Sequence, residues 1–163
     1  EARRRAQGGG WQVTGRDSRG ALVFYSAFDD AVEWKAALQA AVYQRLMADS
    51  ALGAMVGGAI FDAAPVGAVP ATYVAIGPGT ARDASDKTGR GAVHDFAVSV
   101  VTDEAGFHTA KAVAAAVSDA LTGAQLLLLR GRLVGLWFLR AAALRGTSGQ
   151  RRIDLMFRAR IED

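Results

Sequence analysis

The sequence contains no cysteine, which excludes disulfides, thiolate metal sites, iron–sulfur clusters and a cysteine nucleophile. Histidine is nearly as scarce, because the 163 residues include only His94 and His108. The first falls in a predicted strand and the second at the start of a predicted helix, and no recognised ligand spacing joins either to a carboxylate. We therefore interpret both as structural or solvent-facing residues, and we expect no metal site.

Long hydrophobic runs are also absent. The longest tight run is Leu126–Leu129, and Arg130 ends it, whereas a helix needs about 20 apolar residues to cross a bilayer. The basic stretch Arg3–Arg5 is followed by no apolar segment, so it is not typical of a secretory signal. We expect no contact with a membrane.

Neither sign of charge dominates the chain. The 19 Lys and Arg residues face 16 Asp and Glu residues, which gives a net charge of +3. This balance is weak for a protein that saturates phosphates. With 51% hydrophobic and 21% charged residues, the composition is that of one folded domain rather than of a disordered chain.

Three short motifs point toward chemistry, but each lacks its partners. Gly77-Pro78-Gly79 opens a glycine-rich loop without the lysine and the following helix of a phosphate-binding loop. Lys87-Thr88-Gly89 matches one fragment of the penicillin-binding signature, but no Ser-x-x-Lys is present. Asp29-Asp30 is more typical of a helix cap than of paired catalytic carboxylates. We therefore expect no catalytic residues and no cofactor.

Hydrophobic periodicity predicts two main helices. The first covers residues 30–48 and begins at Asp30, a residue type that caps helices. The second covers residues 107–121. Between them, Asp49-Ser50 restarts a short helical turn that Gly57-Gly58 ends.

Strands are predicted from alternating apolar residues and from flanking turn residues. The clearest is the last, in which every second residue from Ile153 to Ile161 is apolar. The stretch 78–92 shows no periodicity, so we expect a long polar loop there, and loops of such length are often functional. The predicted strands cover residues 21–28, 59–62, 72–77, 93–102, 132–145 and 150–161.

This order of elements predicts an α+β fold. Sequential strands joined by hairpins form a mostly antiparallel sheet, and the two main helices pack on one of its faces. Residues 1–33, which begin rich in glycine and arginine, are expected to form an extended N-terminal arm with a possible added strand. Residues 34–163 are expected to form the α+β domain.

Arginines could give the chain an affinity for nucleic acid. Arg3–Arg5 form a basic cluster, and three more arginines alternate on the last predicted strand, namely Arg152, Arg158 and Arg160. This stripe is able either to meet phosphates or to pair with acidic residues of a neighbouring strand. A salt-bridged or solvated face is the favoured interpretation. Trp34 and Trp137 are expected in the core rather than as stacking platforms for bases.

Five segments in this order carry a resemblance to a known family: residues 35–62, Pro70–Gly77, Asp86–Gly91, Gly106–Lys111 and Phe157–Ile161. Together they resemble the tail-completion, or tail-terminator, family of long-tailed bacteriophages, prophages and gene transfer agents. The resemblance covers roughly residues 35–162, as a chain-long pattern and not as one catalytic signature. Residues 1–33 form an extension that typical members lack.

This resemblance implies a structural protein of the virion tail, assembled in the bacterial cytoplasm. Its subunits would form a homo-oligomeric ring, usually a hexamer, at the head-proximal end of the tail tube. The ring would stop growth of the tube protein and join the tail to head-tail connector proteins. DNA would pass through the lumen without sequence readout. Neither catalysis nor a cofactor is implied.

Two segments are the candidates for partner contacts under this hypothesis. In the polar loop, five charged residues suit specific docking to the tube or to the connector, namely Arg82, Asp83, Asp86, Lys87 and Arg90. In the arm, the strand at residues 21–28 could add to the sheet edge of a neighbouring subunit. Its central residues are Val23, Phe24 and Tyr25.

Three alternatives stay open at this point. The chain could be another head-tail connector or tube subunit of the same particle, on a related fold. It could be a small basic nucleic-acid-binding module that uses Arg3–Arg5 and the arginine stripe. It could also be a small α+β enzyme whose site brings together His94, His108 and aspartates.

Overall fold

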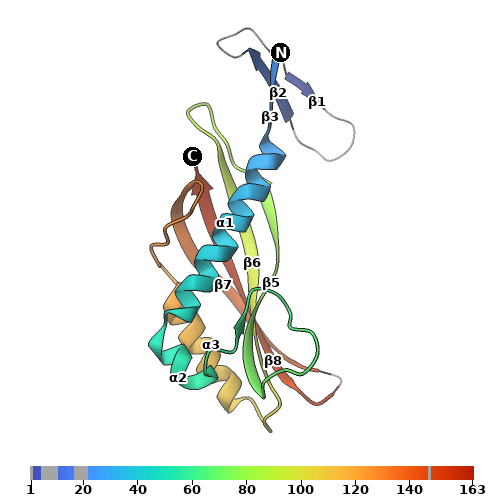
Figure 1. Cartoon of the computed structure of the whole chain (residues 1–163), viewed down its shortest axis with the longest axis vertical. Helices are drawn as coiled ribbons and strands as arrows, with labels where there is room; N and C mark the ends of the chain where they lie inside the picture. The colour runs from blue at the N-terminus through green and yellow to red at the C-terminus, as the bar shows by residue number, and fades with distance from the viewer. Residues whose placement is uncertain (1, 5–10, 17–21, 147) are drawn as a thin grey trace.

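The computed structural model describes residues 2–4, 11–16, 22–146 and 148–163, with side chains from Ala31 onward. A three-stranded sheet at the N-terminus precedes a five-stranded sheet with three helices (Figure 1). In chain order the elements are β1 (Ala2–Arg4), β2 (Trp11–Arg16), β3 (Leu22–Ser26), α1 (Ala27–Met47), α2 (Ser50–Val56), β4 (Ile60–Phe61), β5 (Thr72–Asp83), β6 (Gly91–Thr102), α3 (His108–Leu121), β7 (Arg132–Arg145) and β8 (Arg151–Glu162).

The five-stranded sheet has the strand order β4-β5-β6-β8-β7. All of its neighbouring strands are antiparallel except β4 and β5, which run parallel over two residue pairs. The helices gather on one face of this sheet, with α1 lying along it and α2 and α3 near its lower end in Figure 1. The α+β class, the mostly antiparallel sheet and the one-sided packing of the helices are therefore confirmed.

The core lies between the helices and this sheet. On β8 every second residue is buried, from Ile153 to Ile161, as the alternation predicts. On the helix side of the core, α1 contributes Trp34, Leu38 and Val42, all buried. Each such side chain stabilises the fold by about 1.5–3 kcal/mol relative to its exposed state. Alanines on the inner face of α3 leave the helix thin, so its backbone packs close to the strands.

The first helix differs from the prediction at its start. The structure begins α1 at Ala27, three residues before the expected cap at Asp30. Asp29 and Asp30 therefore lie in the first helical turn, where the helix dipole favours acidic residues without the need for a cap. The short helix α2 confirms its prediction, because the Leu52 N–H donates to Asp49 Oδ1 at 3.0 Å and Gly57 ends the helix with φ 56°.

The predicted polar loop at 78–92 is wrong. Strand β5 continues to Asp83 and β6 begins at Gly91, so the two strands form a long hairpin with a turn at residues 84–90. Beyond Ile76 most of β5 is exposed, so no hydrophobic alternation marks it as a strand. A bulge lies between Ile76 and Gly79. A Cβ on Gly79 would stand 2.7 Å from the Asp95 carbonyl oxygen, so only glycine allows this close pairing.

The N-terminal sheet stands clear of the helices and of the larger sheet in Figure 1. Its order is β1-β2-β3, with antiparallel pairing throughout. The strand predicted at residues 21–28 is present as β3 over Leu22–Ser26, and it is shorter because α1 begins at Ala27. Ala21 lies outside the described residues. No residue separates β3 from α1, so the small sheet is joined directly to the long helix.

Candidate functional site

The five charged residues predicted for partner contacts gather at the tip of the β5–β6 hairpin. Arg82 and Asp83 end β5, whereas Asp86, Lys87 and Arg90 belong to the turn, and all five are exposed. Figure 1 shows this turn projecting beyond the larger sheet, at the end where α1 begins and β8 finishes. The structure therefore brings these residues together on a hairpin tip rather than on an irregular loop.

Two carboxylates of this tip hold the turn itself. Asp86 Oδ1 accepts hydrogen bonds from the Thr88 N–H at 2.7 Å, the Thr88 hydroxyl at 2.6 Å and the Gly89 N–H at 3.1 Å. The Thr88 hydroxyl bond, together with the backbone bonds, lowers the pKa of Asp86 below its ordinary value. Asp83 Oδ1 likewise accepts from the Ser85 N–H and hydroxyl. These Asx turns give the tip a defined shape, whereas the lack of periodicity predicted an irregular loop.

The cations of the tip are held differently. Arg90 forms an ion pair with Asp163 at 2.7 Å, which ties the turn to the end of the chain. Lys87 follows Asp86 in the turn, and no hydrogen bond or ion pair of the described residues involves its ammonium group. The tip therefore presents a lysine on a turn that neighbouring side chains fix.

The strand predicted for addition to a neighbouring subunit is present as β3, whose described pairing is with β2 of the same chain. Val23, Phe24 and Tyr25 lie in β3, where they pair with Gly15, Thr14 and Val13 of β2. Their side chains lie outside the described part of the structure. Since β3 ends the order of the small sheet, its other side has no strand partner among the described residues.

The arginine stripe on β8 is salt-bridged, as the favoured interpretation predicts. The Arg158 guanidinium binds Asp95 through two hydrogen bonds, at 2.7 and 2.8 Å, and Arg152 and Arg160 pair with Asp154 and Glu162. The bonds to Arg158 lower the pKa of Asp95, and the bond to Asp154 raises the pKa of Arg152. These three guanidinium groups therefore do not form a row of unpaired cations that could bind phosphates.

The two histidines do not meet. His94 lies in β6 near the hairpin tip and is 2% exposed, whereas His108 is exposed and begins α3 beyond the other end of β6. Within the described ranges, no three His, Asp or Glu side chains converge in a way that could hold a metal ion. The two imidazole rings therefore do not share one site, as the alternative of a histidine-based enzyme requires.

Burial of His94 predicts an acid-sensitive fold. Neither of its ring nitrogens has a hydrogen-bond partner, and desolvation, followed by the charge of Lys35, lowers its pKa despite the opposing charge of Asp95. In the unfolded chain the His94 imidazole takes up a proton near pH 6.5, whereas in the folded chain it stays neutral at that pH. The free energy of unfolding therefore falls as the pH drops below that value. The slope approaches about 1.4 kcal/mol per pH unit.

Urea unfolding of H94L between pH 7.5 and 5.5 checks this expectation. The variant should show a flatter dependence of its unfolding free energy on pH than the parent protein. H108L is the matched control, because it removes the exposed histidine and should keep the parental slope. Equal slopes for the parent and H94L would contradict the assignment.

The tryptophans divide between core and surface. Trp34 is buried at 2% exposure, as predicted, but the expectation for Trp137 is wrong, because 47% of it is exposed. It belongs to a run of β7 that no helix covers and whose residues are all exposed from Trp137 to Arg145. We call its large apolar members the β7 strip: Trp137, Phe138, Leu139 and Leu144. Periodicity could not reveal this surface, because nearly every residue of the strand is apolar or small.

A groove opens at the other edge of the sheet, where β4 covers only part of β5, and it extends across the sheet to Ser99 and Val101 of β6 and Arg152 of β8. It has a volume of about 330 Å³. We call it the β5 groove. Its lining is mostly small or apolar on the loop side and along β5, and includes Ala63, Ala64, Tyr73, Ala75 and Pro78. Asp62, Lys35 and Arg152 bring charge to its rim.

Comparison with known families decides the relationship. Residues 40–162 match the family model "Tail completion protein gp17", a span that runs from α1 through β8. The chain belongs to the tail-completion family. It is therefore a structural protein of a virion tail, and the resemblance noted in its sequence is confirmed. No curated protein sequence matches it.

A solved structure supports the same relationship for this tail-completion protein. A chain of the "Virion of native gene transfer agent (GTA) particle" is 65% identical to it, with a TM-score of 0.75. The match covers 79% of this chain and 97% of that chain. Among the described helices, none is long and apolar enough to span a membrane.

Proposed function

We propose that this tail-completion protein is one subunit of a ring, a hexamer in our expectation, that caps the head-proximal end of the tail tube. The ring stops tube polymerisation and joins the tail to the head connector. The observation that carries the proposal is the 65% identity to a chain that is itself part of a gene transfer agent virion, matched over 97% of its length. A closed ring needs two different surfaces on each subunit, and the sheet offers two different edges.

The hairpin tip is the proposed contact with the tube or the connector. Its turn is fixed by Asp83 and Asp86, and it carries Arg82, Lys87 and Arg90 on an exposed projection. A rigid, charged tip suits polar docking because it loses little conformational freedom on binding.

The N-terminal sheet is the proposed contact with a neighbouring subunit. The outer side of β3 has no described strand partner, so its main chain, with Val23, Phe24 and Tyr25, is available for strand addition. The family match begins at residue 40, so this contact supplements the part of the fold shared with the family.

DNA is proposed to pass through the ring without being held. Sequence-independent binding needs rows of unpaired cations. On β8 the three arginines that could supply such a row are each paired with a carboxylate. We propose no catalytic step and no cofactor, because the protein acts through its shape and contacts.

Removal of the protein from a particle-producing cell tests the role. Electron microscopy should show heads separated from tails, and tails of variable length, because nothing stops the tube or joins it to the connector. Tails of normal, uniform length attached to heads would overturn the proposal. Immunogold labelling of intact particles separates a terminator from a tube subunit, since a terminator is labelled only at the junction of head and tail.

Charge reversal at the hairpin tip should block assembly without unfolding the protein. K87E changes an ammonium group that makes no described contact, so the melting temperature should stay at the parental value while complementation of the deletion fails. D86N is a matched comparison, because it weakens the bonds that hold the turn and should lower both particle yield and local order. A normal particle yield with K87E would remove the tip from the docking surface.

A further inference from the structure

Half of the β7 edge is left open. At Leu136 the outward carbonyl accepts the Gly123 N–H at 3.0 Å, so the connection from α3 covers the strand up to that point. From Trp137 to Arg145, β8 is the sole strand partner of β7 in the described sheet, and every residue of this stretch is exposed. A long, apolar, open edge strand is a site of pairing or docking with another chain.

Two bulges and a packed indole ring shape the β7 strip. Bulges lie between Leu133 and Gly135 and between Phe138 and Arg140, so Val134 and Leu139 have no cross-strand partner. The Trp137 indole lies over Gly135, where an added Cβ would stand 2.4 Å from its ring. The strip therefore offers a prearranged aromatic ring and a leucine at an exposed edge, the kind of anchor that dominates protein interfaces.

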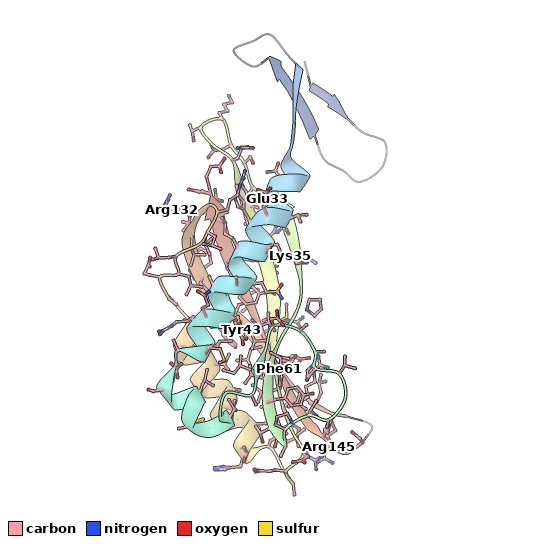
Figure 2. The ribbon with its side chains drawn as sticks, in the orientation of Figure 1. Glu33, Lys35, Tyr43, Phe61, Arg132 and Arg145 are labelled. Atoms are coloured by element: carbon pink, nitrogen blue, oxygen red, sulfur yellow. The ribbon has the colours of Figure 1, made fainter. Side chains whose placement is uncertain are left out.

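The edge of β5 cannot receive a strand in the ordinary way. Pro78 has no N–H to donate, and the Lys35 ammonium already binds the Gly79 carbonyl at 3.0 Å. Figure 2 shows Lys35 on the side of α1 that faces this edge. What this edge offers instead is the β5 groove, which suits the insertion of side chains rather than the pairing of main chains.

One carboxylate of the groove is available to the arginines of β7. Arg140 lies within the open half of β7 and Arg145 ends it, and no described ion pair involves either. Figure 2 shows Arg145 at the far end of that strand. In the groove, Arg152 is paired with Asp154, and the Asp62 carboxylate has no described partner. Lys35 keeps its positive charge, but its ammonium group is directed to the Gly79 carbonyl. A β7–β7 contact would instead bring the arginines of two copies together.

We infer that the β7 strip of one copy seats in the β5 groove of the next copy, with Arg140 or Arg145 approaching Asp62. This inference rests on the proposed ring and names its subunit contact. The strip and the groove are two different surfaces: the strip lies on the β7 edge, whereas the groove opens at the β5 edge and reaches Arg152 of β8. A contact between them joins two copies head-to-tail and can repeat around a ring. Both surfaces fall within residues 40–162 except for Lys35 and Gln39, so nearly all of the contact lies in the family part of the chain.

Cysteine cross-linking in particles tests the inference, because the natural chain has no cysteine. Particles carrying the double variant L139C/A63C are assembled under reducing conditions and then oxidised. Non-reducing electrophoresis should show the 17.0 kDa monomer replaced by a ladder of its multiples. Either single variant, and the control pair L139C/D119C, should leave the monomer band unchanged, since Asp119 is an exposed residue of α3 that belongs neither to the strip nor to the groove lining.

The other occupants of the strip give different results. Covalent dimers with L139C alone would show a β7–β7 contact and overturn the inference. A ladder with L139C/V23C in place of L139C/A63C would assign the strip to the N-terminal sheet of a neighbour and would also overturn it. Normal head-tail particles with no ladder would overturn the subunit contact while leaving the terminator role intact, whereas failure of the deletion test would remove that role.

Discussion

Truncation of Phe157 to alanine should lower the free energy of unfolding by about 3–5 kcal/mol. The residue has no exposed surface. Its ring stacks on Phe96 at a centroid distance of 5.7 Å and meets Phe138 edge-on at 5.8 Å. Because β8 lies between β6 and β7, this cluster joins three strands. The hydrogen bonds between these strands prevent them from moving in to fill the cavity that the truncation leaves.

Urea denaturation of F157A measures this loss as a lower midpoint with an unchanged slope. F138A is the matched control, because it removes a ring of the same cluster that is 41% exposed and should cost clearly less. A loss in F157A no greater than that in F138A would contradict a role for the cluster as the centre of the sheet.

Alanine at position 131 should be nearly as damaging, at about 2–4 kcal/mol, although it adds a single methyl group. Gly131 has φ 76°, which an alanine adopts only with strain. Its Cβ would also stand 2.8 Å from Ile161 Cγ2 and 2.9 Å from the buried Trp34 Nε1. The substitution therefore pushes α1 and β8 apart at the place where the connection to β7 crosses them.

The variant G123A separates the effect of backbone strain from the effect of steric contact. Gly123 has φ 69°, but a Cβ there would meet nothing within 4 Å. The G123A variant should therefore lose stability through backbone strain alone. Thermal unfolding should show a clearly larger loss for G131A than for G123A, accompanied by a change in the near-ultraviolet circular dichroism of tryptophan. Equal losses would show that steric contact with Trp34 and Ile161 is unimportant.

The sequence predicts helices and strands well where one face is buried and the other is exposed to solvent. On β8 the apolar residues alternate from Ile153 to Ile161, and the structure buries each of them. Around α2, the cap at Asp49 and the stop at Gly57 are local signals that need no tertiary information.

The same signals disappear where a strand leaves the core. Beyond Ile76, β5 is exposed on both faces and its alternation is lost, so its pairing with β6 becomes visible only in three dimensions. On β7 nearly all residues are apolar or small, and periodicity cannot tell which of them the helices fail to cover. The exposure of Trp137 and the β5 groove depend on where α3 and β4 end.

The candidate contact residues show the same division. The position of the five charged candidates in a polar, exposed segment follows from the sequence, and the structure gathers these five residues at the hairpin tip. The bonds from Thr88 to Asp86 and the pairing of Arg90 with Asp163 depend on the folded turn and on the chain terminus. Only the structure distinguishes the carboxylates that shape the tip from the lysine that it presents.

The direct passage from β3 into α1 has a mechanical consequence. At 1.5 Å per residue, the 21-residue helix is about 31 Å long and has no hinge between the small sheet and the core. A load applied to the small sheet by a neighbouring component would travel along the helix to Trp34 and Lys35, and through Lys35 to the backbone of Gly79. In the ring proposed above, capture of the small sheet by one neighbour would therefore act on the β5 groove that receives the next subunit, and each addition would favour the following one.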